Sequence, residues 1–430
     1  MLDIKYIREN PDKVRKAIKD KNGNVENLDN AIQKDNLRRS LIIDVEAIRS
    51  RRNQIAEKLK QDKDDALIEE SKQLKERLTK LETELSNIEQ DWKAAMIQIP
   101  NPALENVPVG NDETENKVLR KEGKPPKFSF KPKDHLELGE ALDIIDVGRA
   151  TKVVGGRFAY LKNQAAVLEF ALIQFALSRL MKKGFQPILP PAVVKKSIAD
   201  GLGYWQAGGN QNYWLLTDQE TFDEGLTTKD PDPTYLIGTS EHSVVPMYKD
   251  ETLPESELPK KYVAFSSCFR REAGSYGRDT RGILRVHQFD KLEMVAFVKP
   301  DQDEQVRKEL LGVVEDMMKE LELPYQVVAL CTGDTAFPAA ETIDIETWIP
   351  SQDKYRETHS ISTTTDFQAR RLNIKYQSKD ERGFAHILNG TAIAMPRMII
   401  AILENNQQED GSIKIPKVLQ EYTGFSEIKK

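Results

Sequence analysis

The 430-residue sequence has little cysteine, no long apolar run and no excess of positive charge. Cys268 and Cys331 are its two cysteines and stand far apart, which excludes a disulfide scaffold and a cysteine-rich zinc cluster. No apolar run approaches the roughly 20 residues that a membrane helix needs, and the first residues lack the basic-then-apolar pattern of a signal peptide. We therefore expect a cytoplasmic protein with no membrane partner.

The charge balance also excludes a class of protein. Lys and Arg number 63, Asp and Glu number 69, and the formal net charge is −6. A mildly acidic chain is unsuited to coating nucleic acid without selectivity, so we expect no DNA partner. A local basic face remains compatible with this total.

Several nucleotide and metal motifs are missing from the sequence. It has no Gly-x-x-x-x-Gly-Lys-Ser/Thr phosphate loop, no Gly-x-Gly-x-x-Gly after an expected strand, no Gly-x-Ser-x-Gly elbow and no His-Glu-x-x-His helix. Its five histidines show no metal-ligand spacing, so no zinc is expected. A nucleotide handled by this chain would therefore be bound on a different fold.

A helical hairpin is the first feature that is present. Apolar residues recur at spacings of four and three on both sides of the polar stretch 61–65. They occupy heptad a and d positions, and the short connection predicts antiparallel packing. We assign residues 1–99 to an N-terminal α-helical arm with a coiled-coil hairpin over about 30–95. Its seam comprises Leu41, Val45, Ile48, Ile55, Leu59, Leu67, Leu74, Leu78, Leu81, Leu85, Ile88 and Trp92, with Arg52 and Ser71 as polar exceptions.

The two halves of the hairpin carry opposite charge. Residues 34–63 have nine basic and five acidic side chains, net +4, and residues 64–91 have four basic and nine acidic, net −5. One interpretation is that the two paired helices attract each other, and the charges alone favour this interpretation. The other is that the first half presents arginines to a polyanion such as RNA. Those arginines are Arg38, Arg39, Arg49, Arg51 and Arg52.

A proline-rich linker over residues 100–133 follows, with six of the 21 prolines. Because proline restricts itself and its predecessor, we expect this stretch to be extended. Residues 134–430 open with an apolar-periodic helix over about 164–183 and continue with β-rich runs. Long antiparallel hairpins with few helices predict an α+β domain rather than a doubly wound sheet. The expected strands cover 186–189, 235–238, 262–270, 283–297, 325–330, 340–349 and 385–389.

Charged residues are concentrated in segment 262–297, on two expected strands. Residues two apart share a strand face, so Arg270 can act with Glu272 and Lys291 with Glu293. Arginine forks suit phosphate and carboxylate groups. The commoner meaning of an isolated Arg-x-Glu is a salt-bridged surface hairpin. The loop between the strands would contain Gly274, Gly277 and Gly282.

A second candidate site lies at the start of a late helix. Pro396 fits the first helical turn, which leaves Arg397 near the N-terminus, where the helix dipole disfavours a cation. A bound anion would offset this cost; the alternative is an exposed, screened arginine. A third segment, 184–191, is typical of a helix, a turn and a strand and is uninformative by itself.

Taken in chain order, these three segments resemble the signature motifs of class II aminoacyl-tRNA synthetases. Longer strings, and the opening Leu2-Asp3-Ile4 with its helical hairpin, resemble seryl-tRNA synthetases of the bacterial type over essentially the whole chain. The strings are Gly238-Thr239-Ser240-Glu241, Phe269-Arg270-Arg271-Glu272-Ala273-Gly274-Ser275, His287-Gln288-Phe289-Asp290-Lys291-Leu292-Glu293, Asp366-Phe367-Gln368-Ala369-Arg370-Arg371 and Leu403-Glu404-Asn405-Asn406-Gln407-Gln408.

The resemblance implies an antiparallel-sheet class II catalytic domain behind the helical arm. Members join L-serine to serine tRNA in two steps, through a seryl-adenylate made from serine and ATP. By resemblance, catalysis falls to Arg270, Glu272 and Arg397, and Mg²⁺ to Glu357 and Ser360. The family also implies a homodimer and a hairpin that grips the long variable arm of the tRNA through the five arginines above.

The same matches imply substrate sites. The serine site would consist of Thr239, Glu241, Arg270, Glu293 and Thr391. The ATP site would consist of Arg270, Arg271, Glu272, Val286, His287, Gln288, Phe289, Glu357, Thr358, His359, Ser360 and Arg397. The chain departs from the family at four positions. Thr391 stands where serine is more usual, and Pro396 where glycine is more usual. His359 replaces a small residue, and His242 replaces an apolar residue.

Three alternatives stay open at this point. A ligase that makes an aminoacyl-adenylate but charges a carrier other than tRNA would leave the basic arm without a purpose. A non-catalytic RNA-binding relative would not need to keep the full set of site residues, which are Arg270, Glu272, Glu293, Glu357 and Arg397. Another class II specificity is possible, although threonyl enzymes use a zinc site and no Cys/His cluster is visible in the sequence.

Overall fold

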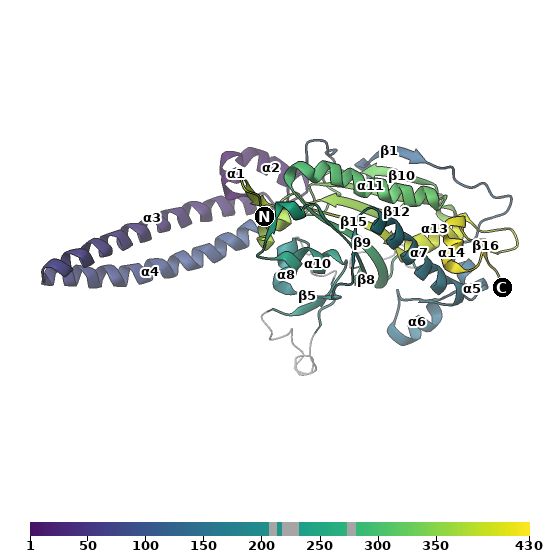
Figure 1. Ribbon diagram of the computed structural model, residues 1–430, viewed down its shortest axis with the longest axis horizontal. Helices are drawn as coiled ribbons and strands as arrows, with labels where there is room; N and C mark the ends of the chain where they lie inside the picture. The colour runs from purple at the N-terminus through teal and green to yellow at the C-terminus, as the bar shows by residue number, and fades with distance from the viewer. Residues whose placement is uncertain (206–212, 217–231, 273–280) are drawn as a thin grey trace. The chain divides into compact units, whose positions relative to one another are not determined.

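The structure is a computed structural model that describes residues 1–205, 213–216, 232–272 and 281–430. Gly274 and Gly277, which the sequence assigns to a loop, lie outside the described residues, as does the string 273–275. The chain divides into two compact units, Met1–Pro102 and Ala103–Lys430. Each unit is considered by itself (Figure 1).

The first unit is helical throughout. Asp3 caps its first helix by accepting a hydrogen bond from the Lys5 N–H, and Pro11 occupies the first turn of the second. Asp64 caps the last helix through the N–H groups of Ala66 and Leu67. The helices are α1 (Ile4–Glu9), α2 (Pro11–Asp20), α3 (Glu26–Gln61) and α4 (Asp65–Met96).

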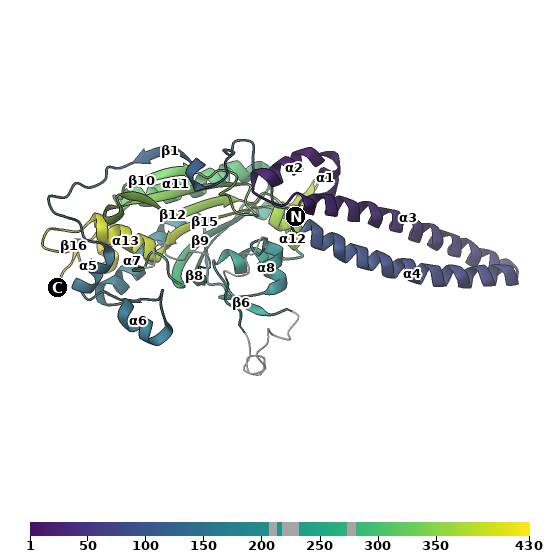
Figure 2. The same ribbon diagram turned by 180° about the vertical axis from the view of Figure 1, so that it is seen from behind.

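Helices α3 and α4 form an antiparallel hairpin, which both ribbon views show (Figures 1 and 2). Val45, Ile48 and Leu78 are buried between them, and partly buried leucines of α4 pack against these three. Ion pairs link the two helices along the hairpin, because the register brings opposite charges together. The predicted coiled-coil arm is therefore confirmed. The pairs are Lys34–Asp91, Arg38–Glu89, Arg49–Glu82 and Arg51–Glu70.

The second unit is built on one large sheet, whose neighbours are antiparallel except for the last pair, which is parallel. The predicted α+β class is therefore confirmed. Eight strands belong to this sheet in the part of the chain that the structure describes. In spatial order they are β1 (Lys117–Glu122), β10 (Tyr325–Ala329), β11 (Glu341–Ile349), β12 (Lys354–Thr363), β15 (His386–Ala394), β9 (Gln288–Val298), β8 (Lys260–Phe269) and β4 (Gln186–Ile188).

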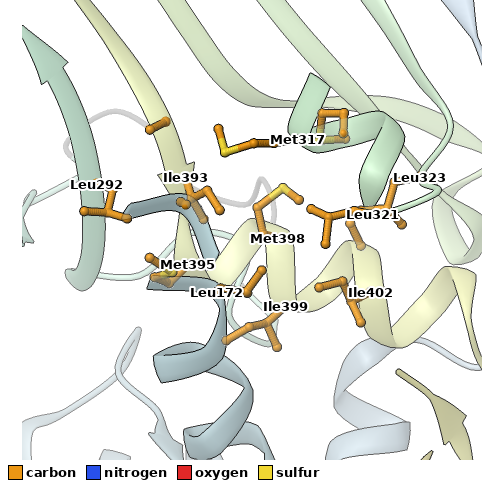
Figure 3. Packing of buried hydrophobic residues seen from close by; sticks show 14 of the residues in the cluster. Leu172, Leu292, Met317, Leu321, Leu323, Ile393, Met395, Met398, Ile399 and Ile402 are labelled. Carbon is orange, nitrogen blue, oxygen red and sulfur yellow. The ribbon is translucent and has the colours of Figure 1, made fainter. Parts of the chain in front are cut away.

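The larger hydrophobic core lies on one face of this sheet, under α7 (Asn163–Lys182), α11 (Asp303–Glu320) and α13 (Met395–Asn405), and a second cluster that includes Tyr262, Val295 and Phe297 lies on the other face. Figure 3 shows Leu172, Leu292, Met317 and Met398 meeting in the larger core from four elements. Full burial of each such side chain contributes roughly 1.5–3 kcal/mol. Since strand residues alternate between faces, burial of Leu292 in this core places its neighbours in sequence on the opposite face.

Helix α7 is long and apolar enough to cross a membrane by length and composition alone. Leu168, Leu172 and Phe175 on this helix join the core, however, and it also contains Glu169 and Arg179. It is therefore a core helix of this unit. Three other apolar residues of this helix face outward: Val167, Phe170 and Met181, at 39%, 64% and 53% exposure.

Candidate active site

A cavity of about 1020 Å³ lies on the face of the sheet opposite the core helices. Its lining comes from β1, β9, β10, β11, β12 and β15 and from the start of α13, so segments more than 150 residues apart in the chain meet there. Nine predicted site residues line this cavity, and a smaller adjoining cavity adds Val286, Phe289 and Thr358. The nine are Thr239, Glu241, Arg270, Glu272, Glu293, Glu357, Ser360, Thr391 and Arg397.

Arg270 follows β8 directly and lines both cavities. Its Nε donates to the Gly238 carbonyl at 3.1 Å, and its guanidinium lies 5.4 Å from the centre of the Phe289 ring. The Arg270 N–H donates to the His287 carbonyl at 2.9 Å, which keeps the two chain segments in register. Because Nε is already bonded, the outer nitrogens remain to meet an anion in the cavity.

Glu272 occupies a strained backbone position two residues further on. Its φ is +49°, a left-handed value that a non-glycine residue rarely adopts. Arg285 Nη1 donates to Glu272 Oε2 at 3.1 Å. Strain of this kind costs on the order of 1 kcal/mol or more and persists where the surroundings fix a functional side chain.

Arg397 and Glu357 form an ion pair that crosses from α13 to β12. Arg397 Nη1 lies 2.9 Å from Glu357 Oε2 and donates to the Glu357 carbonyl at 2.8 Å. Burial alone would raise the pKa of Glu357, but Arg397, Arg270 and Arg285 outweigh it and lower the pKa. The Glu357 carboxylate is therefore ionised. It is an anion next to Arg397 and so offsets the unfavourable interaction of that cation with the dipole of α13.

Strand β11 adds acidic residues that sequence reasoning missed. Asp344 lies opposite Ser360 in the ladder, and Glu346 lies opposite Glu357. Burial and the nearby Glu357 raise the pKa of Asp344 well above its ordinary value. Its buried Oδ1 has no hydrogen-bond partner. The alternation of Asp344 and Glu346 on an expected strand was the available signal.

A buried polar cluster forms another part of the cavity. Lys291 donates to Thr239 Oγ1 at 2.8 Å and forms an ion pair with Glu293. Thr391, directly opposite Glu293 in the ladder, donates to Glu293 Oε2 at 3.4 Å. Lys291 thus connects three predicted serine-site residues, a role that the sequence analysis did not give it.

Glu241 is fully buried beside this cluster. The Tyr204 hydroxyl lies 3.0 and 2.8 Å from its two carboxylate oxygens, and Gln368 Nε2 donates to Oε1 at 2.8 Å. Burial is the largest influence and raises the pKa of Glu241 to about 7, with a further contribution from Glu293. The hydrogen bonds from Tyr204 and Gln368 favour the ionised form of Glu241, but they do not offset the rise in pKa that burial causes.

Four predicted ATP-site residues line neither cavity. Arg271 is exposed, with its guanidinium 5.9 Å from the Trp214 ring, and Gln288 is exposed at the start of β9. His287 Nδ1 lies 2.9 Å from the Arg270 carbonyl, so this ring supports Arg270. His359 is bonded to the Thr358 hydroxyl at 2.9 Å.

The two unusual histidines are buried within regular structure. His359 belongs to β12, and burial lowers its pKa to about 3. His242 belongs to α10 (Glu241–Val244) and lines the large cavity between the rings of Tyr204 and Tyr213. Burial lowers the pKa of His242 to about 3 as well. Both rings are therefore neutral at physiological pH.

The predicted tRNA-binding arginines differ in their surroundings within the first unit. Arg38 and Arg49 are paired with α4 carboxylates, and Arg51 donates twice to Glu70, at 2.7 and 2.8 Å. Arg39 is exposed. Arg52 has a buried Nε without a hydrogen-bond partner. Ion pairing between the two helices thus explains why three of these arginines, Arg38, Arg49 and Arg51, are present on α3.

Comparisons with known proteins agree with this geometry. Residues 1–103 match the seryl-tRNA synthetase N-terminal domain, and residues 226–406 match the class II tRNA synthetase core domain of the G, H, P, S and T enzymes. A serine–tRNA ligase of Borrelia garinii subsp. bavariensis is 42% identical over 100% of this chain and 99% of its own length. One of Thermodesulfovibrio yellowstonii is 42% identical and covers 100% of both chains.

The chain belongs to the seryl-tRNA synthetase family. A crystal structure of seryl-tRNA synthetase from Pyrococcus horikoshii complexed with ATP aligns with a TM-score of 0.91 and 38% identity, over 100% of this chain and 99% of that one. The predictions of a class II fold, of an aminoacyl-tRNA synthetase and of serine–tRNA ligase activity are therefore confirmed. As a seryl-tRNA synthetase, the chain is an ATP-using enzyme.

Proposed function

We propose that the large cavity forms seryl-adenylate from L-serine and ATP and then transfers the seryl group to serine tRNA. The observation that carries this proposal is the contrast within one cavity. Arginines at one side suit phosphates and a carboxylate, whereas buried carboxylates and hydroxyls at the other suit the ammonium and hydroxyl groups of serine.

In the first step, a carboxylate oxygen of serine attacks the α-phosphorus of ATP, and pyrophosphate leaves. We assign Arg270 to both reacting groups, since its outer nitrogens can bridge the α-phosphate and the serine carboxylate. Such a transfer needs positioning and neutralisation of charge rather than a side-chain nucleophile. Glu272 would bind the adenosine end of ATP, with the Phe289 ring and Arg397 on opposite faces of the adenine.

In the second step, a terminal ribose hydroxyl of the tRNA attacks the seryl carbonyl, and AMP leaves. Serine would be held by Thr239, Glu241, Glu293 and Thr391, to which we add Lys291 as a positioning residue. A site that bonds the serine hydroxyl rejects alanine, since its own polar groups would stay unpaired. Threonine must be excluded by size, which is worth only about 1–3 kcal/mol per methyl group.

We also propose that Glu357 and Ser360 hold Mg²⁺. Mg²⁺ prefers carboxylate and phosphate oxygens, and the unpartnered Oδ1 of Asp344, opposite Ser360, makes Asp344 a third candidate ligand. Bound Mg²⁺ would supply neutralisation of the triphosphate charge. Within the described residues, no three or more His, Cys, Asp and Glu side chains are placed to hold a metal ion by themselves, so ATP oxygens would complete the shell.

The remaining assignments concern the whole chain. We propose that residues 1–99 bind the variable arm of the tRNA through Arg39 and Arg52, together with the paired arginines when they exchange partners. Residues 134–430 would carry catalysis, with 100–133 as the linker. We propose a cytoplasmic homodimer, which the outward-facing apolar residues of α7 and the 80% exposed Leu189 support.

Pyrophosphate exchange tests the first step. The purified chain is assayed with serine, threonine and alanine, and then for charging of serine tRNA. Exchange with serine, at least a hundredfold above that with alanine, is expected. Absence of exchange with serine would contradict the proposed activity of this chain. Exchange without charging of tRNA would indicate a ligase that serves another carrier.

A further inference from the structure

Segment 117–133, here called the basic strap, concentrates positive charge on the second unit. It has seven basic residues and one acidic residue, net +6 in 17 residues, so the rest of the chain, with 56 basic and 68 acidic residues, carries −12. All seven basic side chains are exposed. They are Lys117, Arg120, Lys121, Lys124, Lys127, Lys131 and Lys133.

Most of this charge is uncompensated. Arg120 forms a double contact with Glu315, with Nε–Oε1 at 3.0 Å, and so anchors the strap to α11. None of the six lysine ammonium groups has an acidic partner within 4 Å among residues that the structure describes. Lys121 Nζ lies 5.0 Å from the centre of the Tyr355 ring. Six cations are therefore available to an external anion.

The strap is fixed to the catalytic unit at both ends. At its start, β1 pairs with β10, and at its end the Gln407 side chain bonds both the N–H and the carbonyl of Lys133, at 2.8 and 3.0 Å. Figure 1 shows the chain between them passing from β1 to α5 (His135–Ala141). The cations are thus held on a defined path along this unit.

The start of the strap adjoins the active-site cavity, and its end is connected to the cavity wall through one hydrogen bond. Asn116 and Val118 at its start line the cavity, as does Tyr355 beside Lys121. After its end, His135 Nε2 accepts from the Ile283 N–H at 3.2 Å, and Leu284, the next residue, lines the cavity too. The first lysines of the strap therefore lie next to the margin of the catalytic cavity.

Two simpler explanations account for only part of this charge. Lysines on an edge strand such as β1 discourage pairing with another sheet, but Lys124, Lys127 and Lys131 lie beyond the strand. A single ATP triphosphate could occupy one or two of the six lysines. The strap would extend on the order of 50 Å at full stretch, so its lysines together fit a long polyanion.

We propose that the basic strap binds the phosphate backbone at the acceptor end of the tRNA and guides its terminal ribose into the cavity. This inference rests on the proposed function of the cavity. Phosphate contacts carry no sequence information, so the strap supplies affinity and orientation, and selection of the tRNA is made elsewhere.

The test is a triple charge reversal, Lys124→Glu, Lys127→Glu and Lys131→Glu, in the full chain. A matched control carries the same charge change at exposed lysines outside the strap: Lys152→Glu, Lys379→Glu and Lys417→Glu. We expect kcat/KM for serine tRNA to fall at least tenfold in the strap variant and less than twofold in the control. Pyrophosphate exchange, which involves no tRNA, should stay at the wild-type level in both.

Salt dependence and a shortened RNA make the test specific. Loss of three phosphate contacts should reduce the slope of log(kcat/KM) against log[salt] by about 2–3. A minihelix that carries only the acceptor stem should lose binding to the strap variant in the same proportion as full tRNA.

Three results would overturn the proposal. The first is equal charging of tRNA by the strap variant and the control. The second is a parallel rise in the KM for ATP in the strap variant, which would mean that the strap steers the nucleotide. The third is binding of the wild-type strap to phosphatidylserine vesicles, with tRNA charging unchanged in the strap variant. A wild-type chain without serine-dependent exchange would refute the proposed function instead.

Discussion

Glu241→Gln tests the electrostatics of the serine site most directly. The Glu241 carboxyl is 2% exposed and accepts hydrogen bonds from Tyr204 and Gln368. Glutamine has the same shape, and its amide oxygen can still accept from Gln368. The substitution therefore removes the charge while retaining much of the packing.

The magnitude follows from the raised pKa. Burial moves the pKa of Glu241 from 4.5 to about 7, and each pH unit is worth 1.36 kcal/mol, which gives about 3 kcal/mol. The folded state binds this proton more tightly than the unfolded state, so its contribution to stability is present below pH 4.5. That contribution is lost as the pH rises to about 7.

Urea unfolding between pH 4.5 and 8 measures this difference. We expect the free energy of unfolding of the wild-type chain to fall by about 3 kcal/mol more than that of the Gln variant over this range. Glu140→Gln, at an exposed carboxyl, is the control and should parallel the wild type. Parallel curves for wild type and Glu241→Gln would refute the argument that burial raises the pKa of Glu241.

Serine binding gives a second readout of the same group. The serine ammonium favours ionised Glu241, so serine should bind the wild-type chain more tightly at pH 8 than at pH 6, by about tenfold for each pH unit below 7. The variant should bind serine about 10–150-fold more weakly, the usual worth of a hydrogen bond to a charged group, and without this pH dependence.

Three further predictions concern the other parts of the site. Arg270→Ala should lower serine-dependent pyrophosphate exchange by at least a thousandfold, and Arg270→Lys should restore little, because an ammonium lacks the planar fork. Arg51→Ala with Arg52→Ala should weaken tRNA binding in a filter assay and leave exchange intact; equal loss of exchange in this variant and in Arg270→Ala would contradict the division between arm and catalytic unit. Glu357→Gln should raise the Mg²⁺ concentration for half-maximal exchange about tenfold, and an unchanged Mg²⁺ requirement would remove Glu357 from the metal site.

Features carried by contiguous sequence were predicted well. The heptad spacing of Leu41 to Trp92 gave the hairpin, because helical periodicity is a local property. The apolar runs before Arg270 and after Ile283 predicted β8 and β9, although β9 begins only at Gln288. Strand β12 was missed, since its charged and hydroxylated residues lack the apolar alternation of an ordinary strand, and the tertiary structure satisfies them in a polar cavity instead.

The sequence by itself determined the family, the two helices of the arm, the α+β class and most of the residues that line the cavity. Only the tertiary structure decided how these residues are connected. Glu241 meets Tyr204 and Gln368 across 37 and 127 residues of chain, and the resulting burial sets its pKa. Packing between separate elements also paired Arg51 with Glu70 and left the Oδ1 atom of Asp344 without a hydrogen-bond partner. Desolvation and pairing depend on neighbours that the fold brings together, and local sequence patterns do not contain them.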